Sequence, residues 1–116
     1  MLNLDPVKTQ AVATQTRQTF AALDSALADA AHLTAAFLTA SQDSGMTASE
    51  SQRILKQIHE SATKIIEGRS DMVRATALLT RCVERSQYEP TAFGCPIGLE
   101  QEEHQRETAR HLTLVA

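Results

Sequence analysis

Large aromatic side chains are scarce in this 116-residue chain, which has three Phe, one Tyr and no Trp. A core built on aromatic rings is therefore excluded, and any core must be aliphatic. Glycine (4) and proline (3) are also few, whereas alanine (18) and threonine (13) are abundant. This composition favours helices that approach each other closely through small residues over a strand-rich sandwich. At this length we expect one domain.

Charge of one sign and long hydrophobic runs are missing as well. The net charge is −3 and the isoelectric point is 5.7, whereas a nucleic-acid-binding domain is usually strongly basic, with a value above ~9. No stretch approaches the ~20 apolar residues of a membrane span, and the segment 1–6 has no basic flank followed by an apolar run. We therefore expect a cytoplasmic protein with neither nucleic acid nor membrane as a partner.

The two cysteines, Cys82 and Cys95, fit a reducing compartment as free thiols. Cys82 is expected to act as a small core hydrophobe. Cys95 precedes Pro96 in a turn-rich stretch, where a plain turn cysteine is the favoured interpretation. A reactive thiol or a haem ligand are the alternatives.

The dominant positive feature is a four-three spacing of apolar or small residues in the second half of the chain. This spacing is typical of a long helix that packs lengthwise against other helices. Its members are Ile54, Ile58, Ala62, Ile65, Gly68, Met72, Ala75, Leu79 and Val83.

The first helix is expected over 6–41, because Asp5 can cap its free amides and Pro6 suits the first helical position. The turns over 8–19 carry mostly Thr, Gln and Ala, so they should be the least stable part. The rest of the helix shows the same four-three spacing, at Phe20, Leu23, Leu27, Ala30, Thr34 and Phe37, and Leu33 and Leu38 widen this face.

The pattern breaks over 42–45, where Gly45 can adopt the left-handed conformation that ends many helices. Thr47 and Glu50 match the capping box and predict a second helix over 48–86, which ends before Pro90. A connection this short makes the two helices antiparallel neighbours. Beyond it we expect a loop over 87–98 and a short, polar helix over 99–114.

Net charge along the chain supports mutual packing of these segments. It is −2 over 1–45, +2 over 46–86 and −3 over 87–116. A basic segment between two acidic ones indicates helices that attract each other.

Two helices bury only one line of contact, so a long hairpin cannot cover its apolar faces alone. The fold class is therefore predicted to be all-α: a long antiparallel hairpin plus a short C-terminal helix, forming a four-helix bundle on homodimerisation. The predicted dimer interface comprises Phe20, Leu27, Phe37, Ile58, Ile65, Gly68, Met72 and Leu79.

Gly68 lies within the apolar spacing, where it costs up to ~1 kcal/mol relative to Ala. Close approach of a facing helix would compensate for that cost. Arg69 flanks this position and is expected to pair with Asp24 or Asp29.

His59, Glu60 and Thr63 lie in the string His-Glu-Ser-Ala-Thr, which resembles the H-box of the dimerisation and phosphotransfer domains of sensor histidine kinases. The resemblance implies His59 as phospho-acceptor, Glu60 as the base and Thr63 as the residue that positions water. The Pro that commonly follows the H-box is missing. His32 offers a weaker version of an acceptor site. For both histidines, the alternative is an ordinary surface residue.

Glu100, His104, Glu107 and His111 share one face of the predicted third helix and are weak candidates for a divalent-metal site, with Cys95 nearby. The alternative is that these Glu and His pairs only stabilise an exposed helix.

No hydrolase triad, phosphate loop or cofactor motif appears in the sequence. We therefore expect a non-enzymatic, cofactor-free homodimer that acts by protein-protein interaction as an adaptor, chaperone-like protein or scaffold, most simply with another protein as partner. The alternative is a histidine phosphotransfer protein that uses His59.

Overall fold

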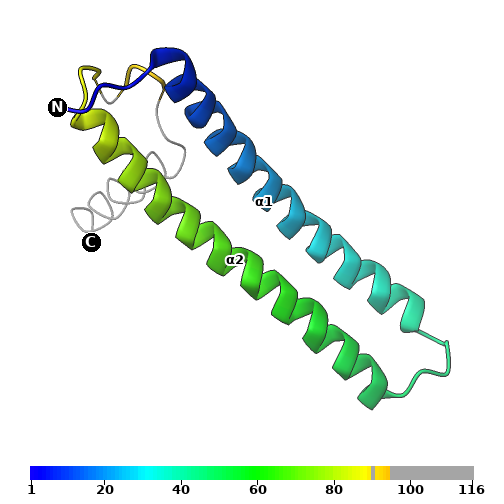
Figure 1. Cartoon of the computed structure of the whole chain (residues 1–116). Helices are drawn as coiled ribbons and strands as arrows, with labels where there is room; N and C mark the ends of the chain where they lie inside the picture. The colour runs from blue at the N-terminus through cyan, green and yellow to red at the C-terminus, as the bar shows by residue number, and fades with distance from the viewer. Residues whose placement is uncertain (90, 95–116) are drawn as a thin grey trace, which may run out of the picture. The chain divides into compact units, whose positions relative to one another are not determined.

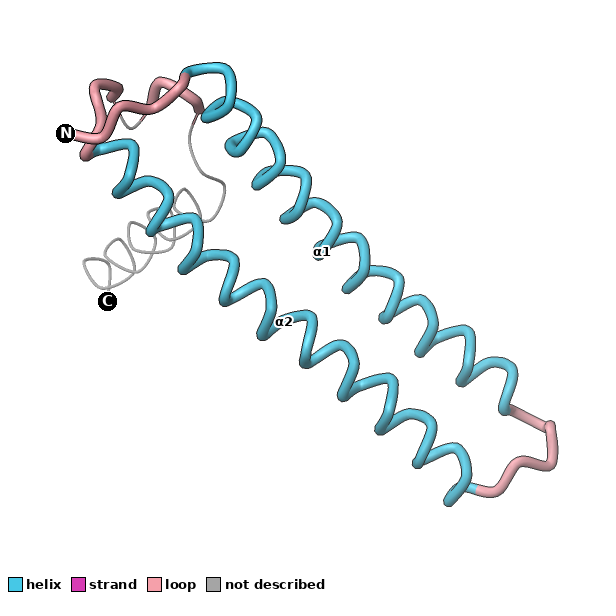
Figure 2. Tube along the Cα trace, in the orientation of Figure 1, coloured by secondary structure: helices cyan, strands magenta, loops and turns pink. Residues whose placement is uncertain are grey.

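Two long α-helices make up most of the chain in its computed structural model, which describes residues 1–89 and 91–94. Helix α1 spans Pro6–Ser41 and helix α2 spans Ala48–Glu84 (Figure 1). The described residues contain no strand, and Figure 2 shows only helix and loop among them. Leu2 and Ser86 form an isolated bridge. The expected all-α hairpin is thus confirmed, whereas the predicted helix over 99–114 lies outside the described residues.

The start of α1 follows from local hydrogen bonds. The Asp5 Oδ1 atom accepts the backbone N–H of Lys8 at 2.8 Å, so Asp5 is the N-cap. Pro6, the first helical residue, has no N–H that would need a partner. At the other end, the chain turns through positive φ at Asp43 (56°) and Gly45 (81°), which carries it away from the helical path.

A capping box starts α2. The Glu50 N–H donates to the Thr47 hydroxyl oxygen at 3.2 Å, and the Thr47 N–H donates to the Glu50 carboxylate at 3.2 Å. Two backbone amides that have no partner within the helix are thereby satisfied, as the sequence predicted.

Helix α2 ends at Glu84, two residues before the predicted end at Ser86. The Ser86 N–H bonds the carbonyl of Val83, three residues back, at 3.0 Å, which tightens the turn. The Arg85 carbonyl accepts the N–H of Leu2 at 2.7 Å. The helix thus ends in a tightened turn whose Arg85 carbonyl is bonded by the N-terminal segment.

The chain divides into two compact units, each of which pairs part of α1 with part of α2. Unit 2, Ala21–Ser70, is a hairpin made of the end of α1, the connecting loop and the start of α2. Unit 1 comprises Met1–Phe20 and Asp71–Ala116. It pairs the start of α1 with the end of α2.

In unit 1, the N-terminal segment is fastened to the residues that follow α2. The side-chain amide of Gln87 donates to the Leu4 carbonyl at 3.0 Å and accepts from the Leu4 N–H at 3.4 Å. Tyr88 and Phe93 stack edge to face, with ring centroids 5.2 Å apart. These contacts hold the N-terminal segment and the residues after α2 in place at the end of unit 1.

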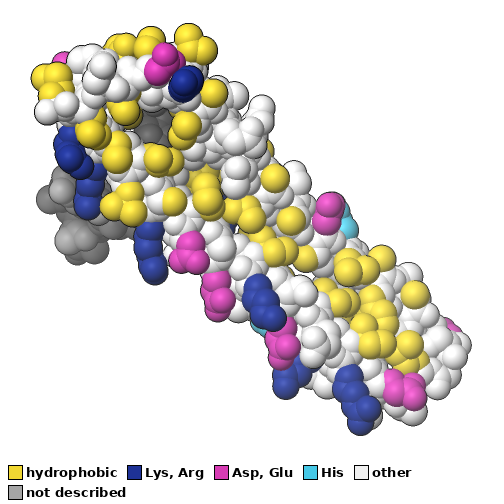
Figure 3. Space-filling model, viewed as in Figure 1, with side chains coloured by type: hydrophobic (Ala, Val, Ile, Leu, Met, Phe, Trp, Pro, Cys, Tyr) yellow, Lys and Arg dark blue, Asp and Glu magenta, His cyan; other side chains and the backbone are white. Residues whose placement is uncertain are grey.

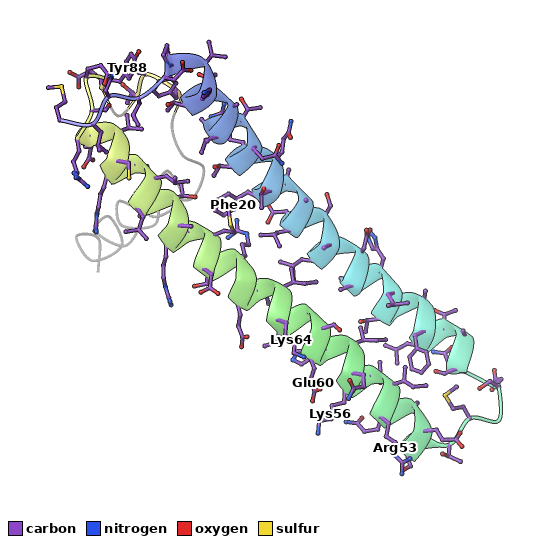
Figure 4. The ribbon with its side chains drawn as sticks, in the orientation of Figure 1. Phe20, Arg53, Lys56, Glu60, Lys64 and Tyr88 are labelled. Atoms are coloured by element: carbon purple, nitrogen blue, oxygen red, sulfur yellow. The ribbon has the colours of Figure 1, made fainter. Side chains whose placement is uncertain are left out.

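The core is thin. Phe20 is 1% exposed and is the one fully buried hydrophobic side chain among the described residues. It lies on the side of α1 that faces α2 (Figure 4). Thr76 is buried as well, and its hydroxyl donates to the Met72 carbonyl at 2.8 Å. Most of the four-three positions are only half-buried, because a single neighbouring helix covers one narrow stripe.

The capping box provides a test of how α2 is held. We expect Thr47→Ala to lower the free energy of unfolding by about 0.5–2 kcal/mol, because it leaves the Glu50 N–H without its side-chain acceptor. Urea unfolding followed by far-UV circular dichroism measures this change. Ser49→Ala, an exposed position two residues on, is the matched control and should be nearly neutral. Equal effects of the two substitutions would contradict the capping role.

Candidate functional site

The exposed apolar side chains of unit 2 are the best candidate for a functional surface. Leu33 is 55% exposed and Ile66 is 56% exposed, and Leu38 and Ile54 also remain exposed. Two come from α1 and two from α2. Ile54 is the exposed first member of the four-three stripe on α2. Leu33 and Leu38, five residues apart on α1, lie on opposite edges of its half-buried stripe, so apolar surface flanks the stripe on both sides. On the face seen in Figure 3, hydrophobic side chains gather between the two helices.

The opposite side of α2 is charged. Arg53, Lys56, Glu60 and Lys64 are all exposed and point away from α1 (Figure 4). The ion pairs among the described residues, Arg69–Asp24 and Arg74–Asp71, involve none of these four side chains. This face is thus a solvated one with charges of both signs.

Most of the predicted interface residues are half-buried between the paired helices. Phe20 differs, because its ring is fully buried within the single chain and has no surface left for a second copy. Leu79 is 42% exposed. The half-buried group consists of Leu27, Phe37, Ile58, Ile65, Gly68 and Met72.

Gly68 has open space beside it. A Cβ atom built there meets no atom within 4 Å outside its own helix backbone and chain neighbours. The close approach expected for this glycine is therefore not made by α1 of the same chain. The expected pairing of Arg69 is confirmed, since its Nε lies 2.8 Å from Asp24 Oδ1. Their side chains are 26% and 54% exposed, so the pair is a partly solvated surface contact.

The histidine candidates are accessible but isolated. His59 and Glu60 are exposed on α2, and His32 is exposed on α1. The Thr63 hydroxyl donates to the His59 carbonyl at 3.0 Å, an ordinary contact within a helix. Within the described part of the chain, nothing bonds the imidazole of His59. The structure thus presents a free imidazole without a built catalytic site.

The metal candidates Glu100, His104, Glu107 and His111, together with Cys95, lie outside the described residues. Among residues 1–89 and 91–94, no group of three or more His, Cys, Asp or Glu side chains could hold a metal ion. Cys82 is a half-buried free thiol. No helix in that part of the chain is both long and apolar enough for a transmembrane segment.

Comparisons with protein-family models, curated proteins and solved structures find no match to this chain. Function must therefore be argued from the residues. Sequence reasoning found the four-three stripe but missed Ile66 as an exposed member of the apolar surface. The available signal was its place next to Ile65, in the one Ile-Ile pair of the chain.

Proposed function

We propose that this protein is a non-catalytic, cytoplasmic homodimer whose two hairpins form an antiparallel four-helix bundle that binds another protein. One observation carries the proposal: the described chain buries a single hydrophobic side chain fully, while large hydrophobic side chains of both helices stay exposed. The free Cys82 thiol suits a reducing compartment.

The apolar surface of unit 2 supports a second copy as its cover. Full burial of a Leu or Ile side chain contributes roughly 1.5–3 kcal/mol. Leu33, Leu38, Ile54 and Ile66 are exposed together in one unit, whereas single exposed hydrophobics are common on any surface. A two-fold dimer buries the same residues on both copies at once.

Charge favours the same arrangement. The outward face of α2 mixes Arg53, Lys56, Glu60 and Lys64, which interact well with water. That leaves the apolar side for association. A net charge of −3 per chain adds little repulsion between two copies.

Gly68 is consistent with a second helix pair. Its cost within a helix is up to ~1 kcal/mol, and α1 of the same chain does not use the space beside it. A backbone that approaches from a second copy would use this space.

Native mass spectrometry of the full chain tests the assembly directly. We expect a dimer mass at micromolar concentration without an added ligand. A monomer under these conditions would overturn the proposal.

A matched pair of leucines tests which surface associates. Leu33 and Leu78 are 55% and 59% exposed, but Leu33 belongs to unit 2, where we place the association surface, and Leu78 belongs to unit 1. We expect Leu33→Gln to raise the dimer dissociation constant about tenfold, because a polar amide would replace buried apolar surface. Leu78→Gln should leave the constant unchanged. Sedimentation equilibrium of both variants measures the difference, and equal constants would place the interface elsewhere.

A second pair tests the space beside Gly68. We expect Gly68→Leu to weaken dimerisation more than Gln57→Leu, because only the first substitution adds bulk where a second backbone would approach. Gln57 is exposed on the same helix. The same sedimentation experiment applies, with circular dichroism to confirm that both variants are helical. If both dimers dissociate equally, Gly68 is only a weak point in the helix.

His59 carries the second candidate function, histidine phosphotransfer, because its imidazole is exposed and free to meet a phosphorylated partner. We expect any phosphoryl transfer from phosphorylated response regulators of the source organism to be lost in His59→Gln and kept in His32→Gln. Radiolabelled phosphate on the protein band measures the transfer. A wild-type chain that accepts no phosphoryl group would eliminate this function.

A further inference from the structure

Unit 1 contains an apolar cavity of about 330 Å³ that the proposed interaction surface does not use. It lies between the first turns of α1 and the last turns of α2, next to the N-terminal segment and the loop at Phe93 and Gly94. Its volume falls at the low end of the range of ligand pockets, roughly 300–1,000 Å³. Its apolar wall includes Val12, Ala13, Leu79, Val83 and Phe93.

The threonines in this wall do not compete for a ligand's polar groups. Thr9 and Thr16 donate their hydroxyl hydrogens to the carbonyls of Asp5 and Val12, at 2.7 and 2.8 Å. The hydroxyls of Thr76 and Thr80, on α2, donate to backbone carbonyls four residues back, at 2.8 and 2.9 Å. With these donors satisfied inside the helices, the cavity presents an apolar surface to a ligand.

Arg17 adds a cation to this wall. Its half-buried guanidinium donates from Nη1 to the Phe93 carbonyl at 3.1 Å. Among the described residues it has no carboxylate partner. Gly94 suits this contact, because its φ is +92° and a Cβ there would lie 3.2 Å from Arg17 Nη1, a tight approach. A half-buried cation that retains unused donors favours an anion.

Basic side chains outnumber acidic ones among the described residues around the cavity. Among residues 1–89 and 91–94, the basic lining residues are Lys8 and Arg17, and the acidic one is Asp5. One oxygen of that carboxylate already accepts the Lys8 N–H as the helix cap. The local balance is therefore positive beside an apolar wall.

We propose that this cavity binds a small amphipathic carboxylate of the fatty-acid class. The carboxylate accepts hydrogen bonds from the Arg17 guanidinium, and the alkyl chain packs against Val12, Leu79 and Val83. This inference does not rest on dimerisation, since the cavity belongs to unit 1 and the exposed apolar residues that carry the dimer proposal belong to unit 2. Leu79, which the sequence placed at the dimer interface, is assigned here to the cavity wall.

Calorimetric titration of the full chain tests the ligand class, with decanoate as the probe below its micelle concentration. We expect one decanoate per chain. Decanol and decyltrimethylammonium, which keep the chain but lack the carboxylate, should each bind at least about tenfold more weakly, because they forgo the charge-assisted hydrogen bonds to Arg17.

Two pairs of variants locate the site. Arg17→Gln should weaken decanoate binding about tenfold or more, and Arg81→Gln, an exposed position outside the cavity, should not change it. Ala13→Leu should block binding by filling the cavity without removing a hydrogen bond. Ala11→Leu, on the exposed side of α1, should bind as the wild type does. Circular dichroism confirms that each variant is folded.

Three results would overturn the proposal. They are no decanoate binding to the wild type, equal binding of decanoate and decanol, and binding that Ala13→Leu leaves unchanged. Leu33→Gln separates this proposal from the dimer, because this variant should keep its affinity for decanoate even where its self-association is weakened.

Discussion

The rest of this structure depends on one constraint: two paired helices bury only the single stripe along which they touch. In the described residues this stripe closes fully over one hydrophobic ring, that of Phe20. The neighbouring apolar residues stay half-buried, and those beside them, such as Leu33 and Ile66, face water. An antiparallel hairpin with so thin a core gains most from burying its sides against something else.

Side-chain size decides where the stripe is filled and where it is hollow. On the side of α1 that lines the cavity of unit 1, the first turns carry small residues such as Thr9, Ala13 and Thr16, which leave space between the helices. The threonine hydroxyls bond to their own helix backbones, which avoids buried polar groups without partners. Bonds from Gln87 to Leu4 and from Arg17 to Phe93 then hold this end of the hairpin. Polar contacts thus hold the two helices together at this end, whereas apolar packing holds them together at Phe20.

The separation along the chain between the residues of each contact explains which contacts could be predicted from the sequence. Caps at Asp5 and Thr47 involve residues within three positions of each other, so their spacing in the chain sufficed. Arg69 was expected to pair with Asp24 or Asp29, and the structure shows Asp24. By contrast, the Gln87–Leu4 contact joins residues 83 positions apart, and the cavity arises from volume that no residue fills. The exposure of Ile66 was also not predicted, because the rotation of each helix about its axis decides which residue beside the stripe is covered.

A thin core also links folding to association. When much of the apolar surface is buried only in an assembly, the free energy of unfolding depends on protomer concentration, because dilution removes the second copy that stabilises the fold. Substitutions at the exposed leucines of unit 2 would then act on stability through assembly, whereas those at the Thr47 cap act within a single chain. A ligand in unit 1 stabilises the same hairpin by a separate route, since it fills space inside one copy. Concentration and ligand would therefore shift the unfolding midpoint independently, and their separate effects would distinguish an assembly that completes the core from a ligand that fills it.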